Sequence, residues 1–259
     1  MNPVGALALK LVLTPVLIGA ASLAGRRWGT AISGWLVGIP FTSAPVAFFL
    51  ALDPGPPFAA RAAEAIMAGA ISQAAFCLTF AWVARRAGWP ASLVAASTGF
   101  ALVTAALVFV RLHVAGAFVV VIIVLVVALF LMPGSAGRPD RPSSFPRWDL
   151  PARMVVATAF VVVLTTAAPL LGPRIAGLLA PFPLYGAVLA AFAYRMEGPA
   201  ESIGVLRGLL LGLFAFACFF LALSTLLERN LVLAFAVAIA AGAIVQSAAL
   251  VLGRRFGLA

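Results

Sequence analysis

The chain has 259 residues, of which 64% are hydrophobic and only 9% are charged, and its mean hydropathy is +1.18. Soluble domains usually carry about 25% charged residues, so this composition excludes an ordinary soluble domain and predicts a chain embedded in a lipid bilayer. The net charge of +10 needs no nucleic acid to explain it, because arginines at helix ends orient membrane proteins. Cys77 and Cys218 both lie inside apolar runs and are interpreted as small buried hydrophobes.

Nine apolar segments follow one another along the chain. They cover residues 4–25, 29–52, 57–84, 90–110, 113–133, 150–171, 173–194, 199–226 and 230–252. Each is long enough for a helix to cross the hydrocarbon core, which takes about 20 residues. Helices are expected because an isolated strand leaves its backbone unsatisfied in lipid. The predicted fold class is therefore an all-α polytopic membrane protein with nine transmembrane helices.

The first segment is predicted to be a membrane helix, not a cleaved signal peptide. No Lys or Arg precedes residue 4, and Arg26 and Arg27 follow the segment, which is the reverse of a secretion signal. Most of the other joints are short. Only "PGSAGRPDRPSSFPRWD", at 133–149, is long, and its polar, Pro-rich composition predicts a flexible linker.

The chain also carries an internal repeat. Residues 10–111 align without a gap on residues 153–254, at an offset of 143, with 26 of 102 positions identical. The predicted organisation is a first four-helix repeat (1–111), a connector helix (112–133), a cytoplasmic linker (134–149) and a second four-helix repeat (150–259). Because an odd number of helices separates each segment from its copy, the two repeats are expected to have inverted topology.

Arginines predict the orientation. With the N-terminus outside, ten arginines lie at cytoplasmic positions and four, Arg61, Arg111, Arg174 and Arg229, lie outside. This imbalance follows the positive-inside rule. We therefore expect a multi-pass protein of the cell inner membrane with a cytoplasmic C-terminus, and the residue usage is typical of a bacterium with GC-rich DNA.

Two prolines interrupt equivalent spans. Pro40 in 29–52 aligns with Pro183 in 173–194, and both lie near the middle of their spans. A mid-helix proline removes a backbone hydrogen bond, and in inverted-repeat transporters such breaks line the substrate site. With Thr42, Ser43 and Tyr185 beside them, these prolines are the predicted solute-binding residues. The alternative is that they are packing kinks, since Pro is common in membrane helices.

Charged residues within the spans are weighed in the same way. Lys10 aligns with Arg153, which suggests two symmetry-related cations that favour an anionic or neutral solute, although both long side chains could instead snorkel to the nearest interface. Glu64 is the candidate coupling carboxylate, with an ion pair to Arg61 as the alternative. Gln73 and Gln246 are expected to form interhelical hydrogen bonds.

Motifs for other chemistry are missing from the sequence. It contains no G-x-x-x-x-G-K-[ST] phosphate loop, no H-E-x-x-H and no G-x-S-x-G. We therefore expect no enzyme activity, no cofactor and no metal site. The predicted function is a transporter or channel whose partners are the lipid bilayer and a small-molecule solute. The alternative is a non-transporting subunit or assembly factor of a larger complex, and the sequence leaves oligomer formation open.

Overall fold

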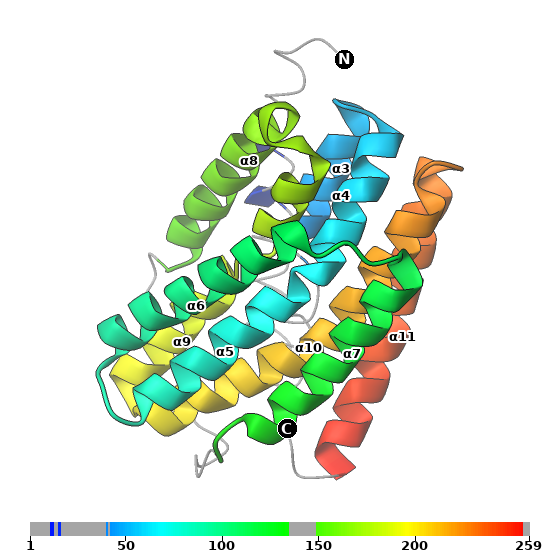
Figure 1. Cartoon of the computed structure of the whole chain (residues 1–259). Helices are drawn as coiled ribbons and strands as arrows, with labels where there is room; N and C mark the ends of the chain where they lie inside the picture. Colours follow the sequence, from blue (N-terminus) through cyan, green and yellow to red (C-terminus); the bar gives the residue numbers. More distant parts are fainter. Residues whose placement is uncertain (1–10, 13–14, 17–39, 41, 135–148, 256–259) are drawn as a thin grey trace.

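The computed structural model describes residues 11–12, 15–16, 40, 42–134 and 149–255 (Figure 1). Lys10, most of the first predicted span, residues 29–39 of the second and nearly all of the linker lie outside the described residues. The described helices are α3 (Ser43–Leu52), α4 (Pro56–Ala68), α5 (Ala70–Ala84), α6 (Trp89–Phe109), α7 (Val114–Leu131), α8 (Asp149–Leu179), α9 (Leu184–Glu197), α10 (Pro199–Leu226) and α11 (Leu231–Arg255).

The predicted all-helical membrane architecture is confirmed at this level. The described residues hold six helices that are long and apolar enough to cross a bilayer: Pro56–Ala84, Trp89–Phe109, Val114–Leu131, Met154–Leu179, Pro199–Leu226 and Leu231–Ala249. The first of these joins α4 and α5 through Gly69, which keeps near-helical dihedral angles (φ −63°, ψ −14°). The helices α3 and α9 are shorter, with 10 and 14 residues.

The centre of the bundle consists of α4, α5 and α10, which pack against one another. Their contact surfaces are rich in small side chains, and Ala59, Ala62, Ala63 and Ala217 are completely buried. Small residues let helix backbones approach closely, which is the usual basis of helix association in membranes. The remaining helices surround this centre: α6 packs on α5, α11 on α10, α3 on α4, and α9 on α10 (Figure 1).

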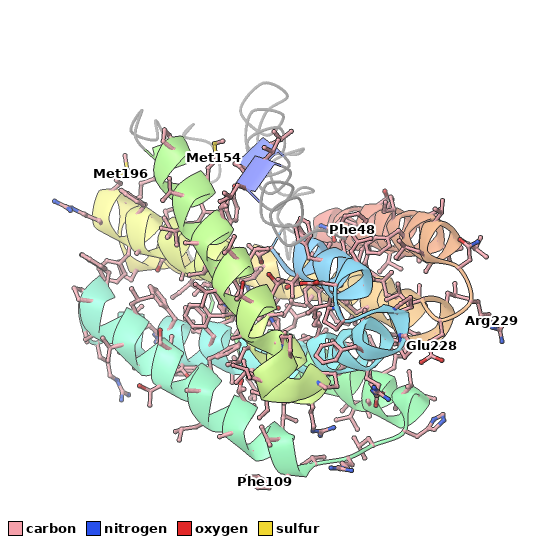
Figure 2. All side chains as sticks on the ribbon, turned by 90° about the horizontal axis from the view of Figure 1, so that it is seen from above. Phe48, Phe109, Met154, Met196, Glu228 and Arg229 are labelled. Atoms are coloured by element: carbon pink, nitrogen blue, oxygen red, sulfur yellow. The ribbon has the colours of Figure 1, made fainter. Side chains whose placement is uncertain are left out.

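The outer surface of the bundle is apolar. Phe109, Phe130 and Leu170 are 86%, 85% and 91% exposed, and Phe109 lies on the outer rim, away from the other helices (Figure 2). Such large apolar side chains pointing outward on several helices would be costly in water. Lipid chains are the environment that fits this surface.

Polar side chains tie helix ends together at both ends of the bundle. At the end where α6 begins, Tyr194 Oη donates to the carbonyl of Ala87 at 3.1 Å. At the same end, Trp82 Nε1 donates to the carbonyl of Leu131 at 3.1 Å. At the end where α6 stops, Arg174 donates to the carbonyls of Leu107, Val108 and Val110. These hydrogen bonds show which helix ends lie together at each end of the bundle.

Candidate functional site

A cavity lies inside the bundle where α3, α5, α9 and α10 meet. Its lining residues are Pro40, Thr42, Ser43, Gln73, Phe182, Pro183, Leu184, Tyr185, Gly186, Leu209, Gly212, Leu213 and Phe216. It leaves about 50 Å³ for the centres of water-sized molecules, whereas one ordered water needs about 10–15 Å³. The cavity is therefore large enough for a small polar solute with some water.

The structure brings five of the sequence-predicted residues together around this cavity: Pro40, Thr42, Ser43, Pro183 and Tyr185. They come from two segments that lie more than a hundred residues apart in the chain. Sequence alignment of the two prolines predicted this juxtaposition, and the structure contains it.

The wall formed by residues 180–183 is a break between α8 and α9. The amide of Phe182 donates to the carbonyl of Leu179 at 3.1 Å and closes a tight turn. Pro183 has non-helical dihedral angles (φ −81°, ψ 56°), and Ala187 donates to its carbonyl at 2.7 Å. The proline thus stands at the N-terminus of α9, a position where its missing N–H costs no helical hydrogen bond.

Pro40 lies just before α3, two residues ahead of its N-cap. The amide of Ala44 donates to the carbonyl of Pro40 at 2.8 Å, which matches the bond from Ala187 to Pro183. Thr42 is the N-cap residue, and its side chain makes no capping hydrogen bond. Pro183 is thus the N-cap of α9, and Pro40 is a non-helical residue three positions before α3.

The two helix starts meet at mid-depth. A rise of about 1.5 Å per residue makes α3 about 15 Å long and α9 about 21 Å long. They run toward opposite ends of the bundle, α3 toward the start of α4 and α9 toward Ala87. Because a helix N-terminus carries partial positive charge, the cavity faces the positive ends of two helices.

A hydrogen bond joins the two breaks. Ser43 Oγ on α3 donates to the carbonyl of Ala180, just after α8, at 3.0 Å. Both residues are buried, with at most 1% exposed surface. This bond satisfies the carbonyl that follows the C-terminal end of α8 and ties α3 to the break.

Gln73 is the polar side chain that α5 contributes to the cavity wall. It is 6% exposed, and its Oε1 has no hydrogen-bond partner within the described chain. The expected interhelical hydrogen bond is therefore wrong for Gln73, and likewise for Gln246, whose Oε1 also lacks a partner in that part of the chain. An unpaired buried amide oxygen costs about 1–3 kcal/mol, so the Gln73 amide is a polar group that the described packing leaves available.

Aromatic rings hold the break in place. The ring of Phe182 meets Phe100 edge-on at 5.2 Å and Phe76 at 6.3 Å between centroids. Phe216, opposite on α10, packs on Phe220 at 4.6 Å. The sequence did not single out these aromatic residues, and it singled out Gln73 only for an interhelical hydrogen bond. For Gln73 and Phe216 a signal was present in the sequence, because position 73 aligns with position 216 at the 143-residue offset on which Pro40 aligns with Pro183.

The other predicted site residues do not line the cavity. Glu64 lies half-buried on α4, and no ion pair joins it to Arg61 among the described residues. Arg207 on α10 aligns with Glu64 at the 143-residue offset. It donates to the carbonyls of Met132 and Pro133 at the end of α7. Lys10 and the side chain of Arg153 lie outside the described residues, so both stay predictions.

The described residues contain no group of three or more His, Cys, Asp or Glu side chains that could hold a metal ion. No protein-family model, curated protein or solved structure matches this chain. The fold and the composition define the class: this is a multi-pass, all-helical membrane protein with six candidate spans among the described residues.

Proposed function

We propose that this protein is a membrane transporter or channel for a small solute, anionic or neutral, and that the solute passes through the cavity between the two helix breaks. The observation that carries the proposal is the convergence of Pro40 and Pro183, each at a helix start, on one cavity. Irregular backbone at mid-depth is tolerated only where it faces protein or water. In transporters, such discontinuous helices form the substrate site.

The proposal includes two inverted repeats, and helix positions support it. Shifting α3, α4–α5 and α6 by 143 residues gives 186–195, 199–227 and 232–252, within three residues of the bounds of α9, α10 and α11. The junctions agree as well. Gly55 and Gly198 precede the aligned helices with φ of 107° and 99° and extended ψ of 167° and −178°.

The helix directions favour inversion. The span α4–α5 ends beside Ala87, whereas α10 starts at that end, next to Tyr194. The pair α6 and α11 likewise run in opposite directions, since α11 follows α10 through a short turn. The packing also corresponds between the proposed repeats: α6 packs on α5, and α11 packs on α10.

The cavity lining supports the proposed repeats. Eight of its thirteen lining residues form four pairs at the 143-residue offset: Pro40 and Pro183, Thr42 and Tyr185, Ser43 and Gly186, Gln73 and Phe216. A site on the axis between two repeats is accessible to either side when the repeats rock against each other. The repeats differ in chemistry, however, because Tyr and Phe in the second half replace Thr and Gln in the first.

A flux assay tests the proposal against the alternative of a non-transporting subunit. The full chain would be reconstituted in liposomes, and uptake of small anions, neutral metabolites and amines measured against empty liposomes. We expect uptake of at least one class, and a strong loss with Pro40→Ala and Pro183→Ala. Pro90→Ala is the control, because Pro90 also lies near a helix N-terminus, in the first turn of α6, but does not line the cavity. If neither Pro40→Ala nor Pro183→Ala changes uptake, or if no uptake is measured, the result would argue for a non-transporting subunit.

A further inference from the structure

We propose that the cavity binds a small monovalent anion. This inference rests on the proposed function, because it names the solute class for the same site. It goes further by assigning Gln73 and Thr42 as the side chains that donate to the ion.

Electrostatics favours an anion. None of the thirteen lining residues carries a charge, so no carboxylate is there to compensate a bound cation. The starts of α3 and α9 both face the cavity, and each helix N-terminus is equivalent to about half a positive charge. The cavity is therefore a neutral pocket with a positive potential, which attracts an anion and repels a cation.

The donors come from three elements. Thr42 lines the cavity at the N-cap of α3, and its hydroxyl makes no capping bond. The amide of Gly186, in the first turn of α9, takes part in none of the described backbone bonds. Gln73 adds a buried side-chain amide with an unpartnered oxygen, and a half-turn of that amide presents its two N–H donors to an anion.

The positive charge at the cavity indicates that the bound anion carries a single negative charge. Two helix N-termini together supply about one positive charge, and the described cavity wall contains no Lys or Arg to add to it. A second negative charge would stay uncompensated away from water, where desolvating an ion costs several kcal/mol. The small volume also limits the ion to a few atoms. Chloride, nitrate and formate fit this description, whereas sulfate does not.

The test measures the melting temperature of the purified full-length protein at constant ionic strength. Sodium chloride, nitrate and formate would be compared with sodium sulfate and gluconate, with potassium replacing sodium in a parallel series and glycerol as a neutral solute. We expect a saturable rise with at least one small monovalent anion. At about 100 times the dissociation constant, the rise should be about 5–10 °C.

Two glutamine variants decide whether the ion binds in this cavity. Gln73→Leu removes the amide from the wall, and Gln246→Leu is its control, because Gln246 is 4% exposed with an unpartnered Oε1 but does not line the cavity. Each change removes an unsatisfied buried oxygen, so neither should unfold the protein. We expect Gln73→Leu to weaken the anion about 10- to 100-fold and Gln246→Leu to leave its affinity unchanged.

The outcomes separate this inference from the proposed function. The protein could instead be stabilised by glycerol, or differently by sodium and potassium, with the effect lost in Gln73→Leu. That result would show that the ligand is not an anion but that it binds in this cavity. An anion effect that is equal in wild type and Gln73→Leu would overturn the assignment to this cavity. If no probe raises the melting temperature and none crosses the liposome membrane, the inference and the proposed function both fail.

Discussion

Gly69 and Pro181 lie so close together that a methyl group on Gly69 would stand 2.3 Å from Cγ of the proline ring. Gly69 joins α4 to α5, and Pro181 belongs to the break between α8 and α9. The break at mid-depth is therefore seated against the one backbone position in this span that has no side chain. This contact connects packing in the bundle centre to the shape of the cavity.

We predict that Gly69→Ala destabilises the protein, because neither the proline ring nor the helix can yield easily. Overpacking of this kind costs about 1–3 kcal/mol. The measurement is thermal unfolding of the purified protein in detergent, together with flux through liposomes. The control is Gly208→Ala on α10, where an added Cβ meets nothing within 4 Å and helix propensity should leave stability equal or higher. A Gly69→Ala protein as stable and active as Gly208→Ala would show that the contact is not needed.

Much of this fold could be predicted from the sequence. Apolar length is a direct physical requirement of a bilayer, and it located the spans that the structure contains, from Pro56–Ala84 to Leu231–Ala249. The prolines marked the breaks, because a residue without an N–H is best placed at a helix start. Pro183 is accordingly the N-cap of α9, and Pro40 lies three residues before the first residue of α3.

What the sequence could not predict is the set of contacts made through space. Gln73 was expected to bond across helices, yet its environment depends on how α5 faces the break, which no local pattern encodes. Arg207 similarly binds the carbonyls at the end of α7, a partner set by tertiary packing. The boundary expected between 150–171 and 173–194 is present inside α8, because Gly172 is non-helical (φ 76°, ψ 164°) and divides it into two helical parts; the second part ends at Leu179, before the break at Pro183.

The two glycines before the aligned helices give a second prediction. Gly55 and Gly198 have φ of 107° and 99°, a region that is essentially restricted to glycine and costs other residues about 1–3 kcal/mol. We expect Gly55→Ala and Gly198→Ala to lower the free energy of unfolding by similar amounts. Gly88→Ala is the control, because Gly88 precedes a Pro-initiated helix with an ordinary φ of −66°. Unequal losses at 55 and 198 would weaken the case for equivalent junctions.

Membrane topology gives a third prediction. The proposed inverted repeats, with nine helices and the N-terminus outside, put residue 140 and the C-terminus on the cytoplasmic side. Reporter fusions after residue 140 and at the C-terminus should therefore both give cytoplasmic signals, and a fusion in the turn at Glu228 and Arg229 should give an external one. Figure 2 shows these two side chains at the edge of the bundle, where a fusion disturbs little. Opposite signals at residue 140 and the C-terminus would rule out this arrangement.

The last prediction concerns the hydrogen bond that joins the breaks. Ser43→Ala leaves the buried carbonyl of Ala180 without its donor, which should cost about 1–3 kcal/mol. The matched control is Ser92→Ala: Ser92 Oγ donates to the carbonyl of Gly88 at 3.0 Å, but that carbonyl also accepts from the amide of Ser92 at 3.1 Å. The control therefore leaves no acceptor unpaired and should be nearly neutral.

The same pair of variants separates stability from transport. Because Ser43 lines the cavity and Ser92 does not, Ser43→Ala should also reduce flux when measured below the melting temperature of the variant, whereas Ser92→Ala should transport normally. Equal melting temperatures for the two variants would mean that the α3–α8 hydrogen bond contributes little. A less stable Ser43→Ala with full flux would confine Ser43 to a structural role, and the polar contacts to the solute would then fall to Thr42 and Gln73.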